Sequence, residues 1–328
     1  KRKKIININV PDSIQNFTDK YNLKNLCVMI TFSIRKSLLE GKFNILIYIV
    51  IEIVRFFKTY KHENPFKASD AVFFYLQSSI AFSDIIEYNE ILIDIVLAYA
   101  YSDNDIDDKR IHYDERVKLS NDMIESCTTK ANKFTGGRAI IASKLKQYPQ
   151  IANSMHLIMK EQHRSIMIQR SNDSSMSEFK DVCFRKGAYT SLLVLHSIVS
   201  NPSIKMKEYA VMCGIVGQML DDLVDVEDDI HDGVNTYATE MLKHNLNLDE
   251  YIMEFLGIYH EVTEHECATD FIKNSISRFL IITAVYRNTN KISNDMYNSF
   301  SHTISYFAIH VWYLYKYLKI LVTVIMFR

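Results

Sequence analysis

Carboxylate side chains concentrate in the segment 218–229, which reads Gln-Met-Leu-Asp-Asp-Leu-Val-Asp-Val-Glu-Asp-Asp. An uncharged, mostly apolar stretch precedes it, so the pattern predicts a buried helix that ends in acids. A helix turns about 100° per residue, so Asp221, Asp225 and Asp229 fall on one slowly drifting stripe, with Asp222 beside it. Carboxylates on a shared face repel one another, and a hard divalent cation such as Mg²⁺, which prefers oxygen ligands, relieves that repulsion. The segment therefore predicts a metal site.

A second acidic cluster, Ser-Asp-Asn-Asp-Ile-Asp-Asp at 102–108, follows the apolar run 91–101. Asp103 and Asp107 are four residues apart and share a helical face, with Asn104 next to them. Mg²⁺ commonly bridges one or two carboxylates to the phosphates of a substrate. Two acid-bearing helices that face each other across a bundle would hold a diphosphate at the mouth of an apolar cavity.

Two plainer interpretations compete with this one. An acidic patch at a helix end is usually a solvated face, although acids at a helix C-terminus are unfavourable against the macrodipole. The second alternative is a calcium loop, because Asp103, Asp105 and Asp107 fit its positions 1, 3 and 5. However, Asp108 stands where that loop requires Gly, and Asp114 stands where it requires Glu. The calcium-loop match is weak.

The composition predicts the elements that must position these acids. Among 328 residues there are only 8 Gly and 4 Pro, too few for the turns of a sheet-rich fold, and 48% of residues are hydrophobic. Helical periodicity runs from about Ile14 onward, and no Gly/Ser-rich or Pro-rich linker divides the chain. We therefore expect one all-α domain over residues 1–328, an antiparallel helix bundle around an apolar cavity. Polar clusters predict its helix breaks at 62–65, 135–137, 171–175, 201–203, 231–233 and 288–294.

Charge, cysteine and hydropathy patterns exclude several classes of protein. A formal charge of −1 gives no basic excess for a nucleic-acid partner. Five scattered cysteines without CxxC spacing, and no secretory signal, predict a reduced cytoplasmic protein. The stretches Phe43–Phe57 and Ile304–Phe327 are apolar, but both contain charged residues. We therefore expect buried helices there and no stable membrane span.

The acidic segments resemble the motifs of the type I isoprenoid synthases, in particular the trans-prenyltransferase-like branch of polyprenyl synthetases and related terpene synthases. That family's second aspartate motif, Gln-x-x-Asp-Asp-x-x-Asp-x-x-x-Asp, is matched in full, by Gln218, Asp221, Asp222, Asp225 and Asp229. Its first motif, Asp-Asp-x-x-Asp, is similar to residues 103–107, with Asn104 at the second position. Residues 184–189 resemble the family segment that supplies a diphosphate-binding lysine, here Lys186.

The resemblance implies the isoprenoid synthase type I fold and a cluster of Mg²⁺ ions, three by the family's pattern. It also implies an allylic isoprenyl diphosphate substrate of about C10–C20 and a homodimer. Lys186, Arg185 and Gln218 would contact the diphosphate. The metal ligands would be Asp103, Asn104, Asp107, Asp221, Asp222, Asp225 and Asp229.

Two departures from the family's pattern bear on the reaction. Chain-elongating members carry Arg-Arg-Gly after the first motif, whereas Lys109-Arg110 comes too early here and Ile111-His112 follows. They also carry Gly-Lys after the second motif, where this chain has Gly233-Val234. Both segments serve the joining of two substrates, so we expect a class I terpene synthase that ionises one allylic diphosphate. A chain-elongating prenyl diphosphate synthase and a non-catalytic, synthase-like metal-binding subunit remain alternatives.

Overall fold

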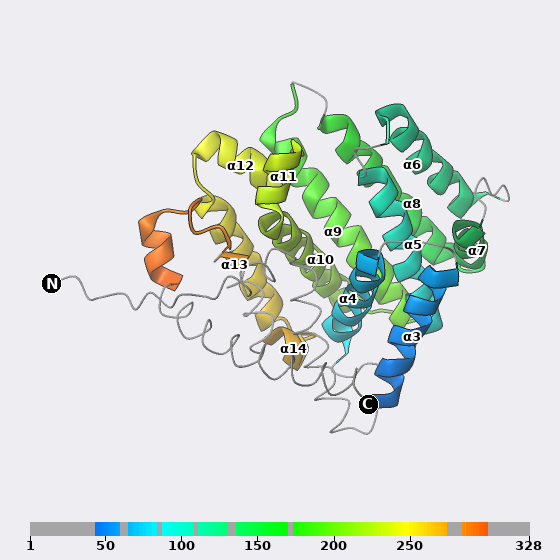
Figure 1. Ribbon diagram of the computed structural model, residues 1–328. Helices are drawn as coiled ribbons and strands as arrows, with labels where there is room; N and C mark the ends of the chain where they lie inside the picture. The colour runs from blue at the N-terminus through cyan, green and yellow to red at the C-terminus, as the bar shows by residue number, and fades with distance from the viewer. Residues whose placement is uncertain are drawn as a thin grey trace, which may run out of the picture.

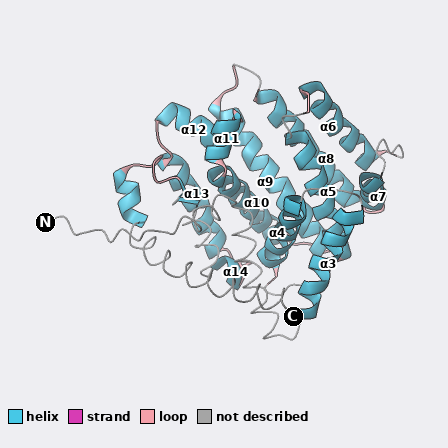
Figure 2. Ribbon diagram, in the orientation of Figure 1, coloured by secondary structure: helices cyan, strands magenta, loops and turns pink. Residues whose placement is uncertain are grey.

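A computed structural model describes residues 43–59, 65–83, 87–107, 111–129, 136–169, 173–273, 284–285 and 287–300. This part of the chain consists of helices and their connections, without a strand (Figure 2), so the all-α expectation is confirmed for it. The helices, numbered as in Figure 1, are α3 (Phe43–Thr59), α4 (Pro65–Phe82), α5 (Glu90–Asp107), α6 (Tyr113–Thr128), α7 (Gly136–Leu145), α8 (Pro149–Ile168), α9 (Met176–Ile198), α10 (Ile204–Val224), α11 (Val226–Asp232), α12 (Tyr237–Asn245), α13 (Asp249–Glu264) and α14 (Asp270–Lys273).

Helix boundaries follow local capping chemistry at several of the predicted breaks. At the start of α9 the Ser175 hydroxyl accepts the N–H of Glu178, whose carboxylate accepts the N–H of Ser175. Ser203 caps α10 in the same way by accepting the N–H of Met206. Gly233 ends α11 at φ 65°, a left-handed conformation that glycine adopts at low cost. These polar residues therefore predict helix ends because they satisfy backbone groups that a helix end exposes.

The long helix α9 joins two hydrophobic cores. The first core, from α3 to α8, includes the fully buried Tyr75 and Leu76 and extends to Leu193 and Val194 of α9. The second core gathers the opposite part of α9 with the end of α10, α12 and α13. In Figure 1, α8, α9 and α10 lie side by side between the two groups. A cavity between the cores would therefore have α9 as one of its walls.

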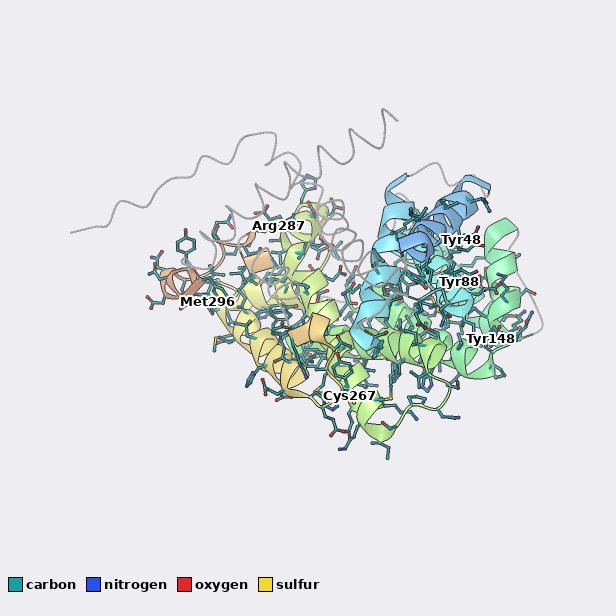
Figure 3. The ribbon with its side chains drawn as sticks, turned by 90° about the horizontal axis from the view of Figure 1, so that it is seen from below. Tyr48, Tyr88, Tyr148, Cys267, Arg287 and Met296 are labelled. Carbon is teal, nitrogen blue, oxygen red and sulfur yellow. The ribbon has the colours of Figure 1, made fainter. Side chains whose placement is uncertain are left out.

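The apolar stretch predicted as a buried helix at 43–57 forms α3, and only one of its faces is buried. Ile49 and Ile53 are fully buried, whereas Ile47 and Tyr48 are 41% and 49% exposed. The exposed Tyr48 meets the ring of Tyr88 edge to face at 5.4 Å (Figure 3). Within the described residues, no helix combines the length and the apolar character needed to cross a bilayer. The second apolar stretch, Ile304–Phe327, lies outside the described residues.

Candidate active site

A cavity of about 540 Å³ lies between the two cores. Helices α4, α5, α6, α8, α9, α10, α11 and α12 and the segment between α11 and α12 line it. Since α9 and α10 are antiparallel and cross at two glycines, the end of α9 lies beside the start of α10. The cavity therefore runs from the acid-bearing end of α10 to Cys213 of the same helix and the end of α4.

Aspartates line one end of this cavity, here called the acid end. They come from the end of α10, from the joint that follows it and from α11. Two neighbouring acids of the same segment do not line the cavity. Glu227 accepts a hydrogen bond from Lys291 at 2.6 Å, and Asp228 lies 3.8 Å from Arg287. The structure thus brings together on one surface Asp221, Asp222, Asp225, Asp229 and Asp232.

The segment 218–229 is not the single continuous helix that its spacing suggests. Helix α10 ends at Val224, and α11 begins at Val226. Asp225 occupies the joint with φ −91° and ψ 4°, while its N–H still binds the carbonyl of Asp221 at 3.0 Å. Asp221, Asp225 and Asp229 nevertheless all line the cavity, so the predicted shared stripe of carboxylates is formed by two helices.

Mutual repulsion and burial perturb the acids at this end. Burial, then the charges of Asp221 and Asp229, raise the pKa of Asp225 to about 8. Burial also raises the pKa of Asp222, although Gln218 donates to its carboxylate at 3.0 Å and Lys186 lies close enough to oppose the shift. A bound cation would stabilise the charged form of a carboxylate whose pKa is raised in this way.

The predicted diphosphate contacts divide into two groups. Lys186 and Gln218 both line the cavity beside the acids. Gln218 also donates to Asp221 at 3.4 Å, so its amide orients two carboxylates. Arg185, one position along α9, does not line the cavity, and its guanidinium donates to Asp181 at 2.9 Å. The predicted role of Arg185 would require it to leave that ion pair.

A close helix crossing brings Lys186 and Gln218 to the same surface. A Cβ on Gly187 would overlap the carbonyl of Gly214, and a Cβ on Gly214 would overlap the carbonyl of Gly187. The backbones of α9 and α10 therefore touch at this point, which only glycine permits. Gly217, one turn further along α10, has room for a methyl group.

The first acidic cluster lies at the C-terminal end of α5. The Asn89 amide, just before α5, donates to the carbonyl of Ser197 near the end of α9, so α5 runs antiparallel to α9. Its last residues therefore reach the same end of the bundle as the last residues of α10 (Figure 1). The side chains of Asp103, Asn104 and Asp107 lie outside the described residues. Residues 103–107 are helical, and this excludes the extended calcium loop considered above.

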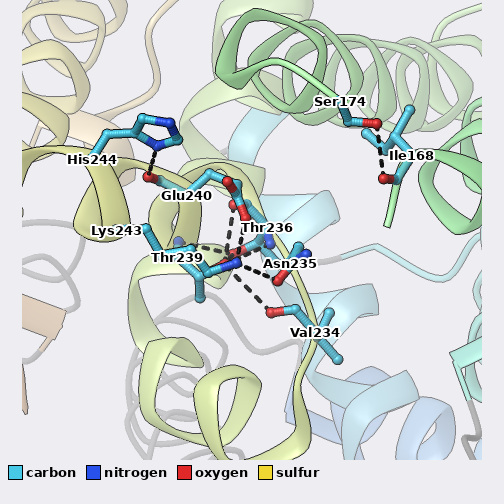
Figure 4. A network of polar contacts seen from close by, with 9 residues as sticks. All are labelled: Ile168, Ser174, Val234, Asn235, Thr236, Thr239, Glu240, Lys243 and His244. Atoms are coloured by element: carbon cyan, nitrogen blue, oxygen red, sulfur yellow. Dashed lines mark hydrogen bonds and ion pairs between the residues drawn. The ribbon is translucent and has the colours of Figure 1, made fainter. Parts of the chain in front are cut away.

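The connection from α11 to α12 follows the acids along the chain, and a polar network holds it in place (Figure 4). Val234, Asn235 and Thr236 line the cavity. The N–H of Thr236 binds the hydroxyl of Thr239 at 2.8 Å, and Lys243 donates to Asn235 at 2.6 Å. The backbone that follows the acids is therefore held from the side of α12.

Several cavity residues were not predicted from the sequence. Asp232 was interpreted as part of a helix break, although it continues the acidic stripe three residues after Asp229, and this spacing could have identified it. Thr190 lies one helical turn after Lys186, a similar local signal. No pattern singled out Arg116, Cys183 or the aromatic side chains of Phe74, Phe82, Phe179 and Tyr237, which line the cavity together with Tyr99.

In the described part of the chain, no three His, Cys, Asp or Glu side chains converge on a point as metal ligands would. The donors at the acid end are nevertheless carboxylate oxygens, the atoms that suit Mg²⁺. No family model matches the chain, and neither the curated proteins nor the solved structures that were searched gave a match.

Proposed function

We propose that this protein is a class I terpene synthase that ionises an allylic isoprenyl diphosphate with Mg²⁺. The observation that supports the proposal most directly is the cavity itself. Five aspartates surround one end, and Lys186 and Gln218 follow. The rest of the wall combines apolar side chains such as Phe74, Phe82 and Val194 with polar ones. An allylic diphosphate combines the same two properties, a polyanionic head and a hydrocarbon tail. The proposal includes the isoprenoid synthase type I fold and a homodimer, as the sequence resemblance implies.

Residues of α10 and α11 would hold the metal, with Asp103, Asn104 and Asp107 as further ligands from α5. The acid end fits Mg²⁺ chemically, since its donors are carboxylates, and burial followed by the charges of Asp221 and Asp229 raises the pKa of Asp225. When bound, Mg²⁺ supplies Lewis-acid stabilisation of the leaving diphosphate.

The chain's own side chains would divide the remaining work. Lys186 would donate to the departing diphosphate, whose negative charge grows as the carbon–oxygen bond breaks. Gln218 would keep Asp221 and Asp222 in place through its two hydrogen bonds. The aromatic lining would exclude water and face the allylic cation, because ring faces attract positive charge.

A chain-elongating prenyl diphosphate synthase would use the same metal site. It would also need a site for a second diphosphate, and the two sequence departures described above argue against one. A non-catalytic subunit would keep the helices without turnover. The same assay separates the alternatives, because chain elongation gives a longer diphosphate and a non-catalytic subunit gives no product.

The decisive experiment incubates the purified full chain and Mg²⁺ with allylic diphosphates of increasing length, with and without isopentenyl diphosphate. We expect inorganic diphosphate and a hydrocarbon or alcohol from the allylic substrate alone, and no reaction in the presence of EDTA. A longer diphosphate formed only with isopentenyl diphosphate would replace the proposal with chain elongation. No turnover of any allylic diphosphate would favour the non-catalytic subunit.

A further inference from the structure

The side of α10 that faces away from the cavity carries two carbonyls with side-chain partners. The hydroxyl of Tyr251, on α13, donates to the carbonyl of Met219 at 2.8 Å. The amide of Asn288 donates to the carbonyl of Leu223 at 2.6 Å. Met219 and Leu223 are four residues apart, so both bonds act on one face of the helix. Tyr251 and Asn288 are buried to within 1% of their surface, and neither lines the cavity.

These bonds lie where α10 ends and its acids begin. Leu223 belongs to the last turn of α10, where carbonyls lack the regular helical partner, and the joint at Asp225 follows two residues later. Asn288 therefore supplies a donor to the end of the helix that the joint interrupts. Tyr251 acts one turn earlier, close to Asp222, and its ring meets that of the cavity-lining Tyr237 with centroids 5.1 Å apart.

The segment that carries Asn288 is attached to the same region by further contacts. The Asn288 amide also donates to the carbonyl of Ala284 at 2.9 Å. Lys291 donates through its ammonium to Glu227 on α11, and its carbonyl accepts the N–H of Leu248 at 2.8 Å. Arg287, labelled in Figure 3, lies 3.8 Å from Asp228. Residues 284–285 and 287–300 thus connect α11, the start of α13 and the joint.

We propose that Tyr251 and Asn288 are positioning residues that set the direction of the acid-bearing end of α10, and through it the affinity of the acid end for Mg²⁺ with diphosphate. The inference rests on the proposed function, because it assigns a purpose to the site described above. Neither residue touches the ligand. Their hydrogen bonds hold the helix that carries Asp221, Asp222 and the joint at Asp225.

The chain offers a matched control for the tyrosine. Tyr259 also lies on α13, is also buried, and also donates its hydroxyl to a main-chain carbonyl, that of Ile272 at 3.0 Å. Tyr251→Phe and Tyr259→Phe each remove one such bond and keep the ring. Asn288→Ala is matched by Asn89→Ala, because each side chain makes two hydrogen bonds with the main chain. Asn89 donates to the carbonyl of Ser197 and accepts the N–H of Leu92, at the start of α5.

The test is a calorimetric titration of the full-length variants with inorganic diphosphate in Mg²⁺, together with their thermal unfolding. We expect all four variants to lose some thermal stability. Only Tyr251→Phe and Asn288→Ala should also weaken binding, by roughly tenfold to a hundredfold, as for residues that orient metal ligands. The controls should bind like the unmutated protein.

The outcomes separate this inference from the proposed function. Unmutated protein that binds diphosphate in Mg²⁺, with all four variants equally tight, overturns the positioning role and leaves the proposed function standing. Equal weakening in the variants and their controls also overturns it, since that pattern reports general loss of packing. Unmutated protein that does not respond to Mg²⁺ and diphosphate overturns both.

Discussion

The acid end of the cavity and its opposite end, here called the apolar end, are built from different side chains for different purposes. Aspartates crowd the acid end, where burial and then the charges of Asp221 and Asp229 raise the pKa of Asp225 to about 8. At the apolar end, Ala81 and Phe82 of α4 and Val194 of α9 line the wall. Apolar burial stabilises the fold, whereas massed carboxylates oppose it. The carboxylates at the acid end therefore lower the stability of the folded protein, as is expected of a binding site.

The helices α9 and α10 connect the two ends, and this explains how one cavity can hold such different surfaces. Val194 and Cys213 line the apolar end, and Phe179 and Asp229 line the acid end. Lys186 and Gln218 lie between them, beside the glycine crossing. A ligand whose charged head lies at the acid end would extend its tail along this pair of helices.

The largest expected effect comes from removing one carboxylate at the acid end. Asp221→Asn should lower Mg²⁺-dependent turnover by about a hundredfold or more, because charge stabilisation by a bound metal is worth several kcal/mol. Steady-state kinetics with an allylic diphosphate measures it. The control is Asp228→Asn, since Asp228 lies in the same segment but points toward Arg287. Equal losses in both variants would contradict a division between cavity-facing and outward-facing acids.

The helix crossing between the two ends gives a stability prediction. Gly214→Ala should destabilise the protein by about 1–3 kcal/mol, as overpacking does, because the added methyl group overlaps the backbone of α9. Gly217→Ala should be neutral or stabilising, since alanine favours a helix by up to about 1 kcal/mol over glycine. Denaturant unfolding of the two variants measures the difference. If Gly214→Ala were as stable as Gly217→Ala, the two helices would not touch as described.

Much of the local structure was predictable because it depends on residues close in sequence. The polar clusters before α9 and α10 and the glycine after α11 mark helix ends through caps that involve neighbouring residues. The acidic stripe was predictable for the same reason. Its aspartates are three or four residues apart in sequence, and they still line one surface although the helix is interrupted at Asp225. Asp225 itself was not predicted as a break, because the donor that satisfies the carbonyl of Leu223 comes from Asn288, 65 residues away.

The composition of the cavity wall was not predictable, because it depends on packing between distant helices. Nothing near Arg116 or Phe82 in the sequence indicates that they line the same cavity as Asp221. Arg185 was predicted to contact the diphosphate, but it does not line the cavity. It is adjacent to Lys186 in sequence, but successive residues on a helix point about 100° apart, and its guanidinium meets Asp181 instead.

The acid end also predicts how stability depends on pH. The pKa of Asp225 is about 8 in the folded protein and 3.8 without its surroundings, so the folded state holds this proton more tightly than the unfolded state. The resulting stability is complete below pH 3.8 and is lost as pH rises toward about 8. Between neutral pH and pH about 8.5, the metal-free protein should lose on the order of 2–4 °C in Tm. Asp225→Asn should lose less, and thermal unfolding in EDTA compares the two. A steeper loss for Asp225→Asn would contradict the assignment.

The smallest expected effect concerns the apolar end. Phe82 lines the cavity at the end of α4 and meets Tyr209 edge to face at 6.0 Å. Phe82→Leu should leave ionisation intact but open space for a longer tail, shifting kcat/KM toward the longer of two allylic diphosphates by roughly tenfold, as for a change of one or two methylene groups. Phe179→Leu is the matched control, because Phe179 lines the acid end. If Phe179→Leu changed length preference as much as Phe82→Leu, the tail would not lie at the apolar end. If neither variant changed it, the length of the substrate would be set elsewhere on the wall.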